Sequence, residues 1–328
     1  MKRKKLIFTI AAISTLTIVT HLFIASTSNV PDLDSEYKKA LTQSYKIYTP
    51  VLPEKMTFAG EKVPLDDYYV KESLDREILV NMYWQSNMLL IMKRSARYFP
   101  TIEKILKEQG VPDDFKYLCV AESGLMNATS SAKAQGYWQF MKATGEQYGL
   151  EVTDEVDERN SLELATIAAC AYLKEMRGKL GSWTSAAAAY NCGENGLSRQ
   201  VGLQNISNYY HLYLNTETAR YLYRILAFKE IMNNPQKYGF NLRHKDLYYP
   251  LPYKTTTIDS TITSVHQFAE QNNVTYKMLK TLNPWIINTS ISNKKKKEYT
   301  IKLPVKNGDA WETIRNKKSS SAEIVTKF

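Results

Sequence analysis

The sequence predicts a mainly α protein, in which a helical domain is followed by a small α+β domain. From residue 66 to about residue 240, apolar side chains recur three or four positions apart, which is the spacing of one face of a helix. From residue 253 to residue 304 the pattern changes to strand, helix, helix, strand, just after two prolines that mark a domain boundary. The chain has 328 residues, 44% of them hydrophobic, so it can bury a sizeable core.

Residues 1–28 are predicted to direct the protein out of the cytoplasm. Four basic residues at positions 2–5 precede an apolar run from Leu6 to Ile24, as in an export signal or a membrane anchor. The run is long for a cleaved signal peptide, and the residues after it offer only a loose cleavage site. Cleavage and retention both stay open, and retention would associate the protein with a membrane through residues 6–25. The expected location is the periplasm or the cell envelope in both cases.

Charge and cysteine content argue against two classes of partner, nucleic acids and metal ions. The net charge is +10, but the basic excess lies at the start of the chain and beyond residue 240, whereas a nucleic-acid enzyme carries it around the active site. The cysteines, Cys119, Cys170 and Cys192, lie in apolar or helical stretches and lack the spacing of metal ligands. We therefore expect buried thiols, no metal and no bound nucleic acid.

The first part of the chain after the signal is predicted to be a spacer followed by two helices. Residues 29–65 are polar and punctuated by prolines, which is typical of a segment with little fold of its own. The helical pattern then runs from residue 66 to residue 99, where Pro100 sets a boundary. It continues as a shorter helix from residue 101 to residue 109.

The next helix, predicted over residues 113–123, carries the strongest candidate for chemistry, Glu122. Pro112 suits the start of a helix and Gly124 the residue after its end. Helical spacing places four residues on one face: Phe115, Leu118, Cys119 and Glu122. A carboxyl group held against apolar side chains loses hydration in its charged form, which raises its pKa and lets it donate a proton near neutral pH. The residues alone also allow the alternative that Glu122 simply ends a helix at the surface.

Three further stretches bear on this choice. Residues 136–141 read Gly-Tyr-Trp-Gln-Phe-Met, residues 189–193 read Ala-Tyr-Asn-Cys-Gly, and residues 217–221 read Glu-Thr-Ala-Arg-Tyr. In the first of them, the aromatic rings offer flat faces to sugars and Gln139 offers donors and an acceptor to hydroxyl or acetamido groups. The second closes an alanine-rich helix, and the third opens another helix.

Together with Glu122-Ser123, these stretches resemble the four motifs of the lytic transglycosylases, most closely those of the membrane-bound lytic transglycosylase D type. One departure is Cys192, where the family usually has Ala or Ser. The resemblance covers about residues 66–240. It implies a lysozyme-like catalytic domain, residues 66–245, whose partner is the glycan strand of peptidoglycan and which acts as a monomer.

The resemblance assigns both proton transfers of the reaction to Glu122. As an acid it would protonate the leaving oxygen of the β-1,4 bond between N-acetylmuramic acid and N-acetylglucosamine, and as a carboxylate it would then deprotonate the muramic 6-hydroxyl. The product is 1,6-anhydromuramic acid, formed without water, metal or cofactor. The residues expected to bind or orient the substrate or the acid are Ser123, Tyr137, Gln139, Tyr190, Asn191, Glu217 and Tyr221. The resemblance would also place Tyr137 and Trp138 partly in the core.

Two other functions stay open. A hydrolytic muramidase of the goose-type lysozyme kind shares the fold, but a hydrolase normally needs a second carboxylate. Glu217 is the best candidate for that group. The third reading is a non-catalytic protein that binds peptidoglycan, which the C-terminal domain allows and which an intact Glu122 argues against.

Residues 253–304 resemble a LysM peptidoglycan-binding module, both in element order and in the sequence Leu-Asn-Pro-Trp at 282–285. The copy is degenerate, because residues 259–262 replace the usual Gly-Asp-Thr/Ser-Leu opening and four lysines, 294–297, occupy a turn that normally contains glycine. Sugar binding and a purely packing role are therefore both open. Residues 305–328 are expected to form a tail.

Two further expectations concern charged segments. Asn160 is predicted to cap the helix that follows it, with Glu163 completing a capping box. The acidic residues between positions 154 and 158 and the lysines at 294–297 are predicted to form solvated loops. Neither Glu163 nor the acidic residues between positions 154 and 158 are candidates for a second catalytic carboxylate.

Overall fold

The computed structural model describes residues 33–43, 48–306 and 321–328. The chain separates into two compact units, residues 1–48 and residues 49–328. In the first unit the described residues include helix α2, Leu33–Gln43. The predicted export signal lies outside the described residues. Within the described ranges, we find no helix that is both long and apolar enough to cross a membrane.

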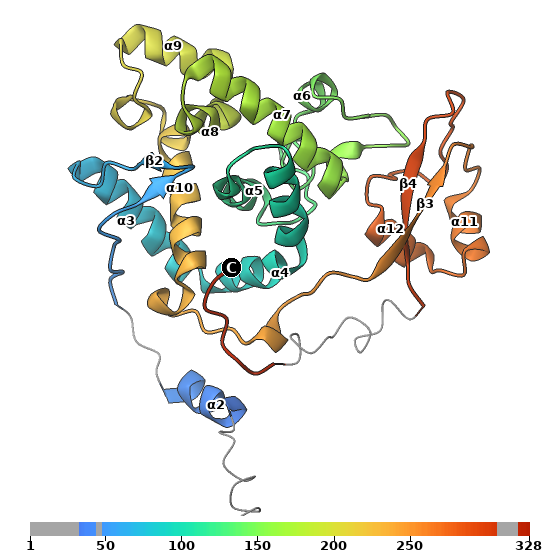
Figure 1. Ribbon diagram of the computed structural model, residues 1–328, viewed down its shortest axis with the longest axis horizontal. Helices are drawn as coiled ribbons and strands as arrows, with labels where there is room; N and C mark the ends of the chain where they lie inside the picture. Colours follow the sequence, from blue (N-terminus) through green and yellow to red (C-terminus); the bar gives the residue numbers. More distant parts are fainter. Residues whose placement is uncertain (1–32, 44–47, 307–320) are drawn as a thin grey trace, which may run out of the picture. The chain divides into compact units, whose positions relative to one another are not determined.

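The second unit is mainly α-helical, as predicted, with two small antiparallel sheets (Figure 1). Its helical part opens with a hairpin of β1 (Thr57–Phe58) and β2 (Glu61–Lys62). The α-helices that follow are α3 (Tyr68–Tyr83), α4 (Gln85–Glu108), α5 (Lys116–Ser123), α6 (Lys142–Gln147), α7 (Leu162–Leu180), α8 (Trp183–Cys192), α9 (Glu194–Gln204) and α10 (Thr216–Asn233). Short 3-10 helices are η1 (Asp113–Phe115), η2 (Glu158–Asn160), η3 (Tyr209–His211), η4 (Pro235–Tyr238) and η5 (His244–Asp246).

Helix α5, which carries Glu122, lies inside a ring of longer helices (Figure 1). α4 and α10 pack directly against α5, α7 packs on α4, α8 packs on α7, and the contact of α8 with α10 closes the ring. The buried face of α5 includes Leu118 and Cys119, which are fully inaccessible to solvent. A helix of eight residues is not stable alone in water, so the surrounding helices fix its position.

The helix boundary predicted at Pro100 is wrong. α4 runs through Pro100 from Gln85 to Glu108, and the break falls at Trp84 instead. Phe99 and Ile102, on either side of the proline, are both buried in the same core. Packing on both sides therefore outweighs the lost hydrogen bond of one proline.

Both segments that were expected to lack structure contribute to the core. Phe58, in the predicted spacer, is fully buried, and its ring meets that of Phe115 edge-on with 5.2 Å between centroids. Val325, in the predicted tail, is buried as well, and the backbone N–H of Phe328 donates to the carbonyl of Met232 over 2.9 Å. Single apolar residues in polar segments give no periodic signal, so the sequence pattern does not reveal these contacts.

The C-terminal part has the predicted order of strand, helix, helix, strand. Its elements are β3 (Tyr253–Ile258), α11 (Val265–Gln271), α12 (Tyr276–Leu282) and β4 (Tyr299–Pro304). The strands pair antiparallel, with Tyr253 opposite Pro304 and Ile258 opposite Tyr299. We call residues 253–304 the C-terminal module. Its apolar core includes Val156, a residue of the helical part.

Gly136 is a position where the fold requires glycine. Its φ is +82°, and a Cβ atom added there would lie 1.9 Å from the backbone oxygen of Arg159. Gly149 has a similar φ of +87° but open space around it. The two glycines therefore separate the cost of backbone conformation from the cost of a steric clash.

We predict that Gly136→Ala destabilises the protein far more than Gly149→Ala. The left-handed conformation should cost about 1–2 kcal/mol at either site, and the clash with a backbone atom should raise the loss at residue 136 to roughly 4 kcal/mol or more. Urea unfolding of the two variants beside the parent protein measures both values. Equal losses would show that the segment around Gly136 can move away from Arg159.

Candidate active site

The carboxyl group of Glu122 lies in the last turn of α5, half-buried inside the ring of helices. α5 ends at Gly124, whose left-handed conformation (φ 59°) stops the helix just after the acid. The Tyr221 hydroxyl, from α10, donates a hydrogen bond to Oε1 of Glu122. The prediction that Glu122 lies on the apolar face of a helix beginning near residue 113 is confirmed, with η1 forming its first turn.

Burial raises the pKa of Glu122 from 4.5 to about 7. Three neighbours modulate the shift: the Tyr221 hydroxyl and the Arg224 guanidinium favour the charged form, and the Glu217 carboxylate opposes it. A carboxyl group with a pKa near 7 exists in both forms at neutral pH, so it can give up a proton and take one back.

Tyr190 and Tyr221 flank the acid as two protonated phenols. The Tyr221 side chain is 2% exposed, and burial together with the nearby Glu122 carboxylate raises its pKa well above the ordinary value. The same two causes raise the pKa of Tyr190, whose hydroxyl donates to the carbonyl of Trp138 over 2.8 Å. Both phenols therefore stay neutral, and the structure brings them to Glu122 as the motifs predicted.

The segment 136–140 is held in place by its own backbone and by two neighbours. Gln139 has a positive φ of 51°, and its Nε2 donates to the carbonyls of Ala128 (2.8 Å) and Gly136 (2.7 Å). Trp138 is fully buried, and its Nε1 donates to Oγ1 of Thr166 over 2.8 Å. The indole face suggested as a sugar platform is therefore part of the core.

The remaining predicted site residues occupy different places. The Ser123 hydroxyl is buried and donates to the Cys119 carbonyl over 3.3 Å, so it bonds its own helix. The Asn191 side chain is half-buried, and the described residues form no hydrogen bond with it. Tyr137 is buried, with its ring 5.0 Å from that of Tyr98. Glu217 is exposed.

Arg224 is a residue that the motifs did not single out. Its Nη1 lies 3.1 Å from Oε1 of Glu217, and its charge lowers the pKa of Glu122. Arg224 lies seven residues after Glu217, which places both on one face of α10. That seven-residue spacing was the sequence signal that could have identified Arg224. The Glu217 carboxylate is thus paired with a cation rather than free to activate water.

A cavity of about 530 Å³ is distinct from the surroundings of Glu122. It is lined by Tyr98 and Tyr137 on the helical side and by Tyr253 and Trp285 of the C-terminal module, and Glu122 is not among its lining residues. In the part of the chain that is described, we find no group of three or more His, Cys, Asp or Glu side chains arranged to hold a metal ion.

Comparison with known families agrees with the motifs. Residues 99–212 match the family described as transglycosylase SLT domain. Residues 99–212 therefore resemble a transglycosylase SLT domain. Residues 254–307 match the soluble lytic transglycosylase C-terminal LysM-like domain. The resemblance read from the sequence is therefore confirmed. Tyr221 lies beyond the matched residues 99–212, but α10 brings its hydroxyl into hydrogen-bonding contact with Glu122.

Two curated relatives are similar over half of the chain. Membrane-bound lytic murein transglycosylase D of Escherichia coli strain K12 is 30% identical over 159 residues. These residues are 47% of this chain and 35% of the relative. The protein of the same name from E. coli O6:H1 gives the same values. The chain therefore spans about a third of the length of the curated relatives that it matches.

The pKa of Glu122 in the SLT domain predicts a pH-dependent stability. Because the pKa is raised on folding, the stabilisation is fully present below pH 4.5 and is lost as the pH rises through about 7. Relative to Glu122→Gln, which cannot titrate, the wild type should lose about 3 kcal/mol of stability over that range. Urea unfolding of both proteins from pH 4.5 to pH 8 measures the difference. A constant difference would mean that Glu122 titrates near its ordinary pKa.

The Tyr221 hydrogen bond predicts a second, separable effect on the same group. Tyr221→Phe removes a donor that favours the carboxylate, so the pKa of Glu122 should rise by about 1 unit. Tyr190→Phe is the matched control, because its hydroxyl bonds Trp138 and not Glu122. Carbon-13 NMR titration of the Glu122 carboxyl in the full chain measures the pKa in both variants. An equal shift in the two would rule out a specific role for the Tyr221 bond.

Proposed function

We propose that the protein is a peptidoglycan lytic transglycosylase that cleaves the β-1,4 bond between N-acetylmuramic acid and N-acetylglucosamine. The observation that carries the proposal is the half-buried Glu122 with a pKa of about 7, held by Tyr221 in a chain whose residues 99–212 match an SLT domain. Such a group suits a reaction in which one side chain must act as acid and then as base.

In the proposed mechanism Glu122 acts twice. Its protonated carboxyl donates to the glycosidic oxygen as the bond between that oxygen and the muramic anomeric carbon breaks, and the acetamido oxygen of the same sugar stabilises the cationic carbon. The muramic 6-hydroxyl oxygen then bonds the anomeric carbon and its proton passes to the Glu122 carboxylate. The product is a 1,6-anhydro sugar, and Glu122 is again protonated.

Tyr221, Tyr190 and Asn191 have supporting roles in this proposal. The hydrogen bond from Tyr221 stabilises the carboxylate in the interval between the two proton transfers. Tyr190 holds the segment that carries Gln139, through the carbonyl of Trp138. Asn191, whose amide has no described partner, is the side chain that we propose for a sugar contact.

The location and domain organisation belong to the same proposal. The relatives are named as membrane-bound proteins, and residues 1–28 have the pattern of an export signal or anchor. We therefore place the protein in the cell envelope, with residues 66–245 as catalytic domain, residues 253–304 as C-terminal domain and a monomer as the working form.

The hydrolytic alternative would need a second carboxylate in reach of a water molecule. Glu217 is the carboxylate whose charge acts on Glu122. It is exposed and paired with Arg224, so it is not held against apolar side chains as Glu122 is. This difference in environment makes Glu217 the matched control for Glu122.

We predict that the protein releases muropeptides with 1,6-anhydro ends from peptidoglycan sacculi. Glu122→Gln should lower this activity by about a thousandfold, because a neutral amide neither donates nor accepts the transferred proton. Glu217→Gln should retain most of it. Mass spectrometry of the released fragments is the measurement. Reducing ends that depend on Glu217 would instead establish a hydrolase, and an active Glu122→Gln protein would refute the mechanism.

A further inference from the structure

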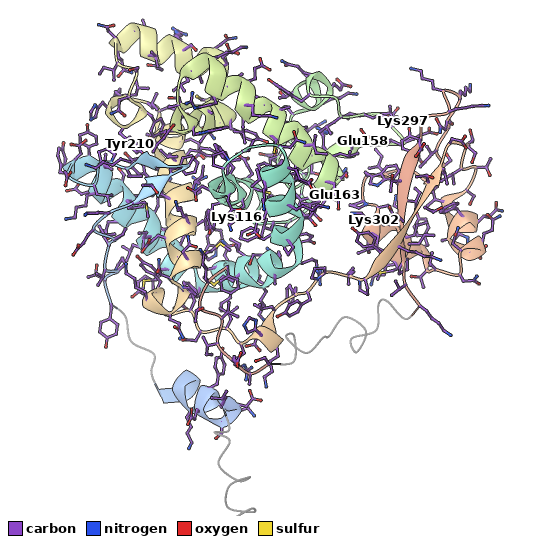
Figure 2. All side chains as sticks on the ribbon, viewed as in Figure 1. Lys116, Glu158, Glu163, Tyr210, Lys297 and Lys302 are labelled. Carbon is purple, nitrogen blue, oxygen red and sulfur yellow. The ribbon has the colours of Figure 1, made fainter. Side chains whose placement is uncertain are left out.

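The acidic segment 151–158 is in contact with the C-terminal module and is not a solvated loop. Nζ of Lys297 lies 2.6 Å from a carboxylate oxygen of Glu151 and 2.6 Å from one of Glu158 (Figure 2). The hydroxyl of Tyr299 also donates to Glu151, over 3.0 Å. The prediction of solvated loops is therefore wrong for Glu158 and Lys297, which pair with each other. Asp154 and residues 294–296 are exposed, as predicted.

Backbone contacts join the same two parts. The N–H of Asp157 donates to the carbonyl of Trp285 over 2.8 Å, and Val156 pairs with Ile286 as an isolated β-bridge. Val156 itself is 1% exposed and belongs to the apolar core of the module. The module thus binds this segment through backbone pairing, apolar packing and ion pairs.

A second ion pair lies beside the first. Nζ of Lys302 lies 2.5 Å from Oε1 of Glu163, in the first turn of α7 (Figure 2). Glu163 therefore bonds the module and does not complete the predicted capping box, and the residue that caps α7 is Ser161 rather than Asn160. Contacts with the module thus extend from the acidic segment to the start of α7.

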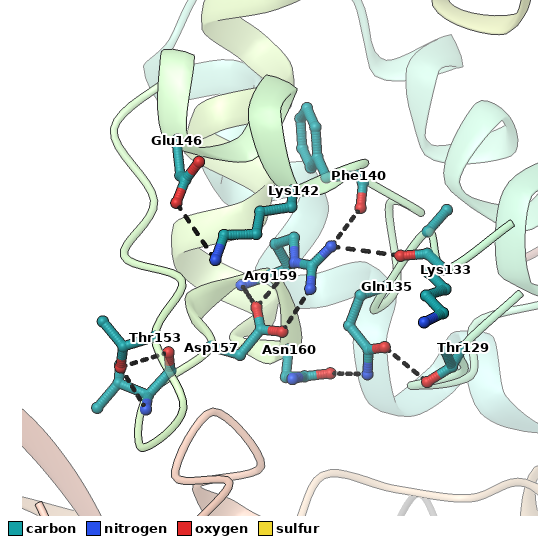
Figure 3. Close-up of polar contacts among 12 residues, drawn as sticks. Thr129, Lys133, Gln135, Phe140, Lys142, Glu146, Thr153, Asp157, Arg159 and Asn160 are labelled. Carbon is teal, nitrogen blue, oxygen red and sulfur yellow. Dashed lines mark hydrogen bonds and ion pairs between the residues drawn. The ribbon is translucent and has the colours of Figure 1, made fainter.

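On its other side, the same segment holds the loop that leads to the active site. The Arg159 guanidinium bonds both carboxylate oxygens of Asp157, at 2.9 Å and 2.7 Å, and its Nη1 donates to the carbonyls of Phe140 (3.1 Å) and Lys133 (3.4 Å) (Figure 3). Nε2 of Gln135 donates to Oδ1 of Asn160 over 2.8 Å. Asp157 and Arg159 are 6% and 8% exposed, so neither charge is compensated by bulk water.

Two further hydrogen bonds connect the segment 133–141 to residues close to Glu122. The Trp138 carbonyl accepts the hydroxyl of Tyr190, and the Tyr137 carbonyl accepts the thiol of Cys119 over 3.4 Å. Cys119 lies one helical turn before Glu122 in α5. Every link from Lys297 to this helix is therefore a hydrogen bond, an ion pair or a short stretch of backbone.

We propose that the C-terminal module is a brace of the active site, and that Arg159 is the positioning residue through which it acts. Lys297 and the backbone of the module fix residues 156–158, Asp157 fixes the guanidinium of Arg159, and Arg159 fixes the carbonyl of Phe140 near the end of the segment 133–141. The part of this inference that concerns turnover rests on the proposed function; the part that concerns loop order does not.

The test uses the full chain with four variants. Lys297→Met removes the charge that Glu151 and Glu158 share, and Lys297→Arg restores it. Lys295→Met removes an exposed charge from the same turn and is the matched control. Arg159→Lys keeps the positive charge but cannot bond Asp157 with two nitrogens while reaching Phe140.

Hydrogen exchange of residues 133–141 is the first measurement, because it needs no substrate. We expect exchange in this segment to be about tenfold faster in Lys297→Met and Arg159→Lys, with α10 unchanged and with Lys295→Met and Lys297→Arg like the parent. Unchanged exchange in Lys297→Met would overturn the brace. So would equal acceleration in α10, since that indicates general destabilisation.

Steady-state cleavage of a soluble glycan fragment is the second measurement. The brace predicts that kcat falls about tenfold in Lys297→Met and Arg159→Lys with KM nearly constant, because a loosened loop misplaces groups that act in the transition state. Recovery by Lys297→Arg is expected. A loss seen only as weaker binding to sacculi would show a wall-binding module and overturn the proposal. If the parent protein cleaves nothing, the proposed function fails, and the exchange result still decides the brace.

Discussion

The arrangement of the helical domain depends on holding one carboxyl group out of water without neutralising it. Burial by α5 and its neighbours disfavours the charged form of Glu122, while the hydroxyl of Tyr221 favours it. The two effects place the pKa at about 7 rather than at either extreme. Because α5 is short, this balance is maintained only if α4 and α10 keep it in place, which the ring of helices does.

The segment 133–141 is a second element whose position is fixed, and it has little regular structure of its own. Its order comes from specific contacts: Gln139 bonds two carbonyls of its own loop, Trp138 bonds Thr166, and Gly136 lies against the backbone of Arg159. The hydrogen bonds of Gln139 and Trp138 satisfy polar groups that would otherwise lack a partner, and the absence of a side chain at Gly136 permits the close approach. The loop is therefore fixed by bonds to α7 and to the segment before α7, not by local propensity.

The sequence predicted those features whose signal is local. Glu122 lies on an apolar helix face, and periodicity over seven residues is enough to show it. The four strands and helices of the C-terminal module were likewise visible in short patterns. Lys297 and Glu158 are 139 positions apart, and each alone reads as a solvated charge. The helix boundary predicted at Pro100 was wrong for the same reason. Buried contacts on both sides of the proline outweigh its local tendency to end a helix.

These long-range contacts also change the meaning of the boundary at Pro250 and Pro252. Composition and family assignment both divide the chain near this point, yet residues 49–328 form one compact unit. Glu158 is 5% exposed and pairs with Lys297 of the module, and Val156 is 1% exposed and packs in the module's core. Without the module, the Glu158 carboxylate would lose this cation and the Val156 side chain would lose its apolar contacts. The boundary therefore marks a change of local pattern, whereas the folding unit includes both parts.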